Sequence, residues 1–166
     1  FVVTCIIINA VIPSESMEKT IMTGDRLIGN RLAYGINLQI GDKQICKKMR
    51  DPKRFDIIIF RYPDDESELY IKRIIGLPGE TVQIKNGSVY INGELLKAQD
   101  GLGEATIAGA AEYPVELGED EYFLLGDNRE SSEDSRFSGI GNIKRENLIG
   151  RVWLRFQPFS RLGFVR

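Results

Sequence analysis

Two short segments of the sequence carry side chains from which a hydrolytic site could be built. Ser14 and Ser16 lie in IPSESMEKT, directly after an Ile- and Val-rich run, and Lys72 lies in LYIKRIIG. The sequence contains no histidine, so neither a Ser-His-Asp triad nor a Cys-His pair can form within it. The remaining metal-free choices are a serine deprotonated by a lysine and a pair of aspartates. Zinc bound by histidine is excluded, and two cysteines, Cys5 and Cys46, cannot form a cysteine-only site.

Lys72 stands out because of the strand that must carry it. Alternation along LYIKRIIG puts Tyr70, Lys72 and Ile74 on one face, and Ile71, Arg73 and Ile75 on the other. A charge therefore interrupts whichever face turns inward. A lysine in such a place usually extends its amine to the surface. If it remains buried, loss of hydration favours the neutral amine, which is what a general base requires.

A third polar segment, LLGDNRESSEDSR (residues 124–136), follows a predicted strand. Gly-Asp-Asn is a good turn sequence, and a solvated acidic turn is the simplest interpretation. The density of hydroxyl, carboxylate and guanidinium groups also suits a functional loop.

Strand patterns dominate the elements that must position these residues. We expect strands in DRLIGNRL, DIIIFRY, LYIKRIIG, EYFLLGD and NLIGRVWLRF, and two hairpins with turns at Asn86-Gly87 and Asn92-Gly93. Residues 31–50 should hold a short helix at most, and the first 13 residues favour a buried strand. The predicted fold is mainly β, a partly closed antiparallel barrel or sandwich with a small hairpin-like appendage.

Length and composition fit one domain with a small appendage. The chain has 166 residues, 42% of them hydrophobic, and a net charge of −2, so nothing suggests a nucleic-acid partner. The segment 101–114 is rich in Gly and Ala and should contribute little to a core. We therefore predict a catalytic β domain over 1–85 and 119–166, with residues 86–118 as an inserted lobe or a long loop.

Four segments, taken in order, resemble the sequence boxes of bacterial type I signal peptidases. SESMEKT is similar to the family's Ser-Gly-Ser-Met-x-Pro-Thr, and RFDIIIF to Arg-Gly-Asp-Ile-Val-x-Phe. KRIIGLPGE is similar to Lys-Arg-x-x-Gly-x-Pro-Gly-Asp, and GDNRESSEDSR to Gly-Asp-Asn-x-x-x-Ser-x-Asp-Ser-Arg. Together with the closing RFQPFSRLGF, these boxes cover most of the chain outside residues 86–118. The resemblance implies the signal-peptidase fold and a membrane-associated serine endopeptidase that cuts after an Ala-x-Ala type site.

The resemblance also implies a role for individual residues. Ser16 matches the nucleophile and Lys72 the general base. Ser14 matches the hydroxyl that helps to hold the oxyanion, and Ser132 the hydroxyl that orients the lysine amine. The positions that match shallow substrate pockets are Ile12, Met17, Ile21, Ile59, Tyr70 and Ile71, and those that match structural residues near the site are Asp127, Asp134 and Arg136. No metal and no organic cofactor is implied.

Three residues depart from the family pattern: Glu15 and Phe55 replace glycines, and Lys19 replaces a proline. Lys19 is also close to Ser16 in sequence, but a loop lysine stays solvated, so Lys72 remains the predicted base. Two alternatives stay open, a Ser-Lys autoprotease of the SOS-repressor type and a non-catalytic β domain that binds extended peptides.

The same resemblance implies partners and a location. The partners are the signal peptide of a preprotein and the surface of a lipid bilayer. The catalytic domain is expected on the extracytoplasmic face of the cell membrane. The apolar start is shorter than the ~20 residues that span a bilayer, so we expect the N-terminal anchor to be absent from this chain.

Overall fold

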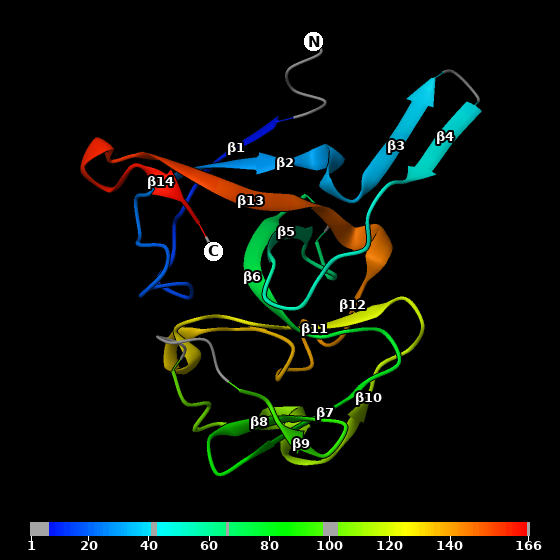
Figure 1. Cartoon of the computed structure of the whole chain (residues 1–166), viewed down its shortest axis with the longest axis vertical. Coiled ribbons are helices and arrows are strands. Elements are labelled where there is room, and N and C mark those ends of the chain that lie inside the picture. The colour runs from blue at the N-terminus through cyan, green and yellow to red at the C-terminus, as the bar shows by residue number, and fades with distance from the viewer. Residues whose placement is uncertain (1–6, 41–42, 66, 98–102, 166) are drawn as a thin grey trace.

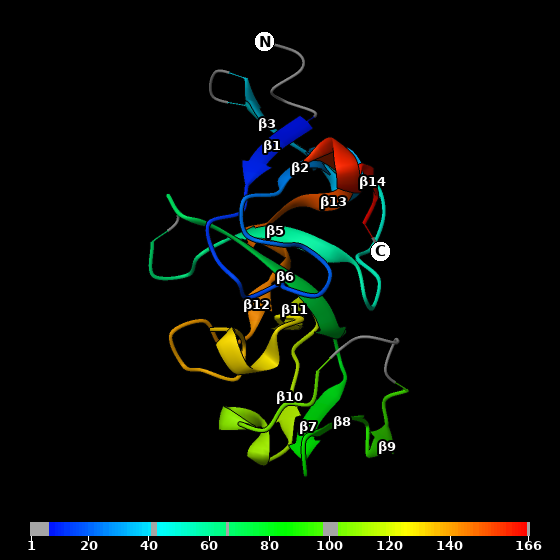
Figure 2. The ribbon, with the colours of Figure 1, turned by 90° about the vertical axis from the view of Figure 1, so that its left-hand side faces the viewer.

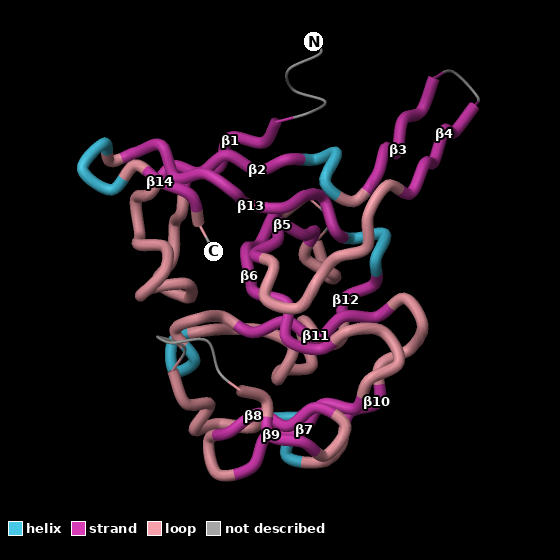
Figure 3. The backbone as a smooth tube through the Cα atoms, in the orientation of Figure 1, coloured by secondary structure: helices cyan, strands magenta, loops and turns pink. Residues whose placement is uncertain are grey.

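The described part of the chain is built from antiparallel strands and short 3-10 turns (Figures 1 and 3). The computed structural model describes residues 7–40, 43–65, 67–97 and 103–165, and the side chains of all of these except 36–48. Within these ranges no residue forms an α-helix. The mainly β, antiparallel fold that the sequence predicts is confirmed.

The main sheet has eight strands in the order β1-β2-β13-β5-β6-β11-β12, with β14 paired to β13. Its strands are β1 (Ile7–Val11), β2 (Arg26–Asn30), β5 (Ile57–Arg61), β6 (Leu69–Gly76), β11 (Glu121–Leu125), β12 (Ile143–Lys144), β13 (Leu148–Gln157) and β14 (Gly163–Phe164). The short turns around it are η1 (Arg31–Ala33), η3 (Arg129–Ser131), η4 (Arg145–Asn147) and η5 (Phe159–Arg161).

A smaller sheet forms a lobe at the opposite end of the molecule from β1 and β2 (Figures 1 and 2). Its four strands, in the order β10-β7-β8-β9, are β7 (Thr81–Lys85), β8 (Ser88–Ile91), β9 (Glu94–Leu95) and β10 (Val115–Glu116), and η2 (Gly109–Glu112) lies beside β7. The lobe sheet thus includes β7, which comes before residue 86. A separate two-stranded arm, β3 (Gly35–Ile40) and β4 (Lys43–Lys48), projects from the main sheet.

Strands β5 and β6 lie in the middle of the main sheet, and this position fixes the environment of Lys72. Ile58 pairs with Lys72 and Phe60 with Tyr70. One face of these strands packs into a cluster with Ile58, Phe60 and Ile74, while Ile57 and Ile59 of the other face pack into a second cluster. The alternation predicted from the sequence is therefore confirmed for this strand.

The predicted hairpin turns are confirmed. Asn86-Gly87 joins β7 to β8 and Asn92-Gly93 joins β8 to β9, and all four residues have the positive φ angles that such turns require.

Residues 31–50 stay within the expected limit of a short helix, the 3-10 turn η1, and their described part also forms the two strands of the arm, which the sequence analysis did not predict. Two other expectations are wrong. The first described strand, β1, is an edge strand paired with β2 among the described residues, and its own residues are exposed or half-buried rather than buried. The Gly- and Ala-rich segment does contribute to a core, since Ala105 and Ala111 are fully buried in the lobe cluster.

Candidate active site

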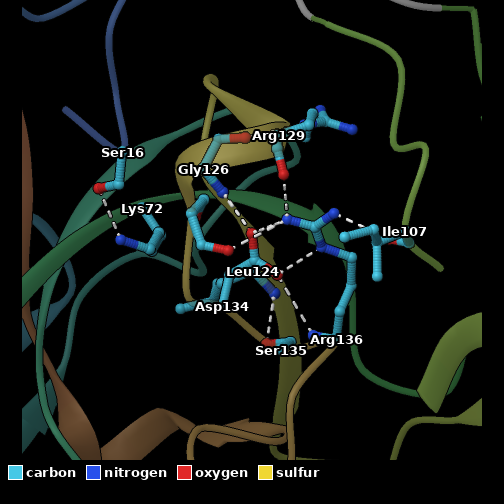
Figure 4. Close-up of polar contacts among 10 residues, drawn as sticks. Ser16, Lys72, Ile107, Leu124, Gly126, Arg129, Asp134, Ser135 and Arg136 are labelled. Atoms are coloured by element: carbon cyan, nitrogen blue, oxygen red, sulfur yellow. Dashed lines mark hydrogen bonds and ion pairs between the residues drawn. The ribbon is translucent and has the colours of Figure 1, made fainter. Parts of the chain in front are cut away.

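The side chains of Ser16 and Lys72 meet inside the protein, although 56 positions separate them in sequence. The Lys72 Nζ lies 2.8 Å from the Ser16 Oγ (Figure 4). Only 7% of Ser16 and 4% of Lys72 is exposed. A serine hydroxyl in direct contact with a buried amine is the arrangement in which lysine can take the serine proton.

Burial changes the acidity of the Lys72 amine. Loss of hydration lowers its pKa from 10.5 to about 8, and the carboxylates of Asp134, Glu133 and Asp127 offset part of this effect. The shift brings a large fraction of neutral amine within reach of mildly alkaline pH, without any metal ion.

The turn that carries Ser16 is held from two sides. Within the turn, the Glu18 N–H donates to the Glu15 carbonyl, and the Ile21 N–H donates to that of Met17. From outside, the Asn128 N–H donates to the Ser16 carbonyl at 3.1 Å, and the Asn128 side chain donates to the Glu15 carbonyl at 3.2 Å. Asn128 therefore fixes the Ser16 turn against the loop after β11, a contact that the sequence analysis did not predict.

The two further predicted hydroxyls differ in burial and in hydrogen bonding. The Ser14 Oγ is 3.4 Å from the Ser16 Oγ, and Ser14 is exposed. The Ser132 Oγ is buried and has no hydrogen-bond partner among the described residues. Its predicted bond to the Lys72 amine is therefore not formed in this structure.

Gly126 lets the Ser132 loop approach the Ser16 turn. A Cβ atom on Gly126 would lie 2.5 Å from both the Ser132 Cβ and the Ser16 carbonyl oxygen, and closer still to the Ser132 Oγ. Carbon atoms in contact are normally about 3.5–4.0 Å apart. Only glycine fits at this position, and the absence of a side chain there allows Ser132 to lie next to the Ser16 turn.

Two buried ion pairs support the loop. The carboxylate of Asp127 accepts from the Arg73 Nε at 2.8 Å and from its Nη2 at 2.6 Å. The carboxylate of Asp134 accepts from the Arg136 Nε at 2.8 Å and from the Gly126 N–H at 3.0 Å (Figure 4). The sequence analysis named Asp127, Asp134 and Arg136 as structural residues near the site, but it did not identify Arg73 as the partner of Asp127.

Arg136 also ties the loop to the lobe. Its guanidinium donates to the carbonyls of Arg129 and Ser132, and to that of Ile107 in the lobe segment. The buried guanidinium groups of Arg73 and Arg136 each donate to several acceptors, as a buried charge requires.

The predicted pocket residues form part of the core in this structure. Ile12, Met17, Ile21 and Ile59 are buried in one cluster, and Ile71 packs against it. Tyr70 lies on the other face, against the cluster that contains Phe60.

Two of the three departures from the family pattern fall on unusual backbone. Lys19 has φ +89° and Phe55 has φ +70°, a region that favours glycine, whereas Glu15 is not among the positive-φ residues. The side chain of Lys19 is exposed.

Cys5 and the side chain of Cys46 lie outside the residues that the structure describes.

A buried Ser-Lys pair on an antiparallel β fold is an arrangement compatible with a serine peptidase that has no catalytic histidine. Comparison with known proteins gives the family. The family model described as "Signal peptidase, peptidase S26" matches residues 1–157. A probable signal peptidase I-2 of Synechocystis sp. is 38% identical over 93% of this chain and 65% of its own length. Signal peptidase I of Pseudomonas aeruginosa is 33% identical over 93% of this chain and 70% of its own length.

A solved structure supports the same family. The crystal structure of a signal peptidase I from Enterococcus faecalis V583 superposes with a TM-score of 0.53 at 35% identity, over 63% of this chain and 98% of that one. The chain therefore belongs to the signal peptidase family, peptidase S26, and is a serine endopeptidase of the signal peptidase I type, which cleaves signal peptides from exported proteins.

This family is membrane-associated. Across the described ranges, no helix has the length and the apolar character needed to cross a bilayer.

Proposed function

We propose that Ser16 is the nucleophile of this signal peptidase and that Lys72 is its general base. The observation that supports the proposal is the 2.8 Å contact between two buried side chains, one of which is an amine with a pKa near 8. Among the residues whose side chains the structure describes, no other lysine is buried.

The proposed reaction proceeds in two steps. The neutral Lys72 amine accepts the Ser16 proton as the Ser16 Oγ attacks the carbonyl carbon of the scissile bond. The resulting ammonium then donates a proton to the leaving amine, which leaves an acyl-enzyme ester. In the second step Lys72 takes a proton from water, the water oxygen attacks the ester, and the proton returns to Ser16.

Ser14 is proposed to stabilise the oxyanion together with the Ser16 backbone N–H. The Ser14 hydroxyl is close enough to the Ser16 Oγ to reach an oxygen that develops on a carbon bonded to it. Ser132 is proposed to orient the Lys72 amine after a small movement, because its buried hydroxyl has no other partner among the described groups.

Four substitutions test the nucleophile and the base. Ser16→Ala and Lys72→Ala should each abolish cleavage of a preprotein, and Lys72→Arg should be equally inactive because guanidinium does not deprotonate. Lys19→Ala is the matched control, since it removes an exposed lysine three residues from Ser16, and it should retain most activity. Loss of activity in Lys19→Ala with survival of Lys72→Ala would reverse the assignment.

The supporting hydroxyls should differ in their effects. Ser14→Ala should lower the single-turnover rate by about 100-fold or more, as removal of an oxyanion donor does. Ser132→Ala should have a smaller effect, because the base itself remains. Wild-type rates in both variants would show that the two proposed roles are wrong.

The substrate is proposed to bind as an extended segment with small side chains at the first and third positions before the cut. Side chains two residues apart point to the same side of an extended peptide, so an Ala-x-Ala site presents both small groups to one surface. Replacing either alanine with leucine should abolish cleavage, whereas leucine at the intervening position should be tolerated.

The end of the main sheet that carries β1, β13 and β14 is proposed to rest on a lipid surface. The catalytic domain would then lie on the extracytoplasmic side of the membrane. Trp153 stacks on Phe164 at 5.6 Å, and large apolar side chains around this pair are exposed, among them Val11, Phe159 and Leu162. Tryptophan and phenylalanine at a surface suit the membrane interface.

Co-sedimentation with anionic vesicles tests the lipid contact. Trp153→Ser with Phe164→Ser should release the protein from vesicles. The control is Tyr113→Ser, which removes an aromatic side chain that is 75% exposed and follows the lobe turn η2. Equal binding of all three proteins would contradict the proposed surface.

A further inference from the structure

A pair of stacked tyrosines extends away from the proposed base. The Lys72 Nζ lies 5.6 Å from the centre of the Tyr70 ring, and the Tyr70 and Tyr62 rings are stacked at 4.9 Å with an angle of 15° between their planes. Tyr70 belongs to β6 and Tyr62 follows β5, and both are half-buried. Aromatic surface therefore continues from Lys72 for about 10 Å, roughly three residues of an extended peptide.

Two exposed carboxylates lie near the hydroxyl end of this stack. Asp64 accepts a hydrogen bond from the Tyr62 hydroxyl at 3.4 Å. A methyl group on Gly139 would lie 3.5 Å from the same hydroxyl and 3.9 Å from a Glu133 oxygen, so the Tyr62 hydroxyl and the Glu133 carboxylate converge on one point. Glu133 lies between Ser132 and Asp134 in the active-site loop. We call Tyr62, Tyr70, Asp64 and Glu133 the tyrosine–acid strip.

The electrostatics agree with this placement. Burial is the main reason why the pKa of Tyr70 is raised, and Glu68 and Glu133 raise it further. Glu133 also raises the pKa of Lys72 against the larger effect of burial. The Glu133 carboxylate is therefore within electrostatic reach of both the base and the aromatic stack.

Aromatic faces beside carboxylates form a surface that attracts cations. A lysine or arginine over a tyrosine face at an exposed site binds about two- to fivefold more tightly, and an exposed carboxylate adds a similar factor. A glutamate in the same position would be repelled. The molecules that must pass here are the peptides that reach Ser16, because Tyr70 adjoins the amine that contacts the Ser16 Oγ.

We infer that the tyrosine–acid strip binds a lysine or arginine side chain of the preprotein, three or four residues from the cleaved bond. The inference deepens the proposed function, because it rests on cleavage taking place at Ser16. It makes Glu133 and Tyr62 specificity-determining residues, and it predicts that this peptidase favours preproteins with a basic residue at that distance.

The test compares kcat/KM for a set of peptide substrates, separately for the wild-type enzyme and for each variant. A reference Ala-x-Ala peptide receives lysine, norleucine or glutamate at one position at a time, from six residues before the cut to four after it. Norleucine is the matched probe because it has the lysine stem without the charge. The measured quantity is the ratio of kcat/KM for the lysine peptide to that for the norleucine peptide, at pH 9 and low salt.

For the wild type we expect a ratio of about 3 to 10 at one position three or four residues from the cut, on one side of it. The glutamate peptide should give a ratio below 1 there. The preference should weaken in 0.5 M NaCl, because salt screens exposed charges. In Glu133→Gln with Asp64→Asn the lysine ratio should fall to near 1, and Tyr62→Leu should lower it about two- to threefold.

Glu119→Gln is the control for loss of a negative charge. Glu119 is exposed and lies in the turn before β11, and the five residues of β11, about 16 Å of extended chain, separate this turn from Gly126. Its ratio should equal that of the wild type. Ratios near 1 at every position in the wild type would overturn the inference, as would a lysine preference that survives the double substitution. Because each ratio is taken within one active enzyme, these outcomes are independent of the Ser16→Ala test of the nucleophile.

Discussion

Gly126 is the position at which a single added carbon should most affect the active site. In Gly126→Ala the new Cβ would lie 2.5 Å from the Ser132 Cβ and from the Ser16 carbonyl oxygen. Since carbon contacts settle at about 3.5 Å or more, these neighbours must move by about 1 Å. The two groups that move are the nucleophile turn and the loop that carries Ser132.

The size of the effect follows from that displacement. A misplacement of about 1 Å at a catalytic group can lower the rate by about 100-fold. Inserting a methyl group into a well-packed site also costs about 1–3 kcal/mol of unfolding free energy. We therefore expect kcat/KM to fall by about 100-fold, with a loss of stability that leaves most of the protein folded at 25 °C.

The assay is kcat/KM on an Ala-x-Ala peptide, together with urea unfolding. Gly163→Ala is the matched control, because a Cβ there would meet nothing within 4 Å, and it should behave like the wild type. If Gly126→Ala retained more than a third of wild-type kcat/KM while folded, the close approach of the Ser132 loop to Ser16 would not matter for catalysis.

Two further predictions concern stability. Asp127→Asn should lower the unfolding free energy by about 3–5 kcal/mol, because it leaves the buried Arg73 guanidinium without its carboxylate. Asp51→Asn breaks an ion pair of similar length in which the Asp51 side chain is 71% exposed, and it should cost less than about 1 kcal/mol; equal losses in urea unfolding would contradict this reasoning. Phe55 has a φ of +70°, a backbone conformation that favours glycine. Phe55→Gly should therefore be about 0.5–1 kcal/mol more stable than Phe55→Ala, although alanine is usually the more stabilising of the two residues. A more stable alanine variant would show that the backbone is not strained.

Much of the frame around the site was predictable from local patterns. The alternation in LYIKRIIG separated Tyr70, Lys72 and Ile74 from Ile71 and Ile75, and these residues lie on the two faces of β6 as predicted. The Asn-Gly turns were predictable because few residues accept positive φ at two successive positions.

Features that depend on tertiary neighbours were not predictable in this way. Ala105 and Ala111 are core residues because the lobe strands close over small side chains, which composition alone does not reveal. The strands of the β3–β4 arm were not predicted, because polar residues lie in both of them and interrupt the apolar pattern that marks a strand. The pairing of Arg73 with Asp127 spans 54 positions, and no spacing rule connects them.

The pH dependence of kcat/KM tests the central claim most directly. In the proposed mechanism the free enzyme is active only when Lys72 is neutral, so kcat/KM for an uncharged peptide should rise with pH through the pKa of this amine. Burial lowers that pKa to about 8, so the rate should increase about tenfold per unit below pH 7.5 and level off above pH 9. A profile that is flat between pH 6 and 9, or that has its maximum near pH 5, would contradict the assignment of Lys72 as the base.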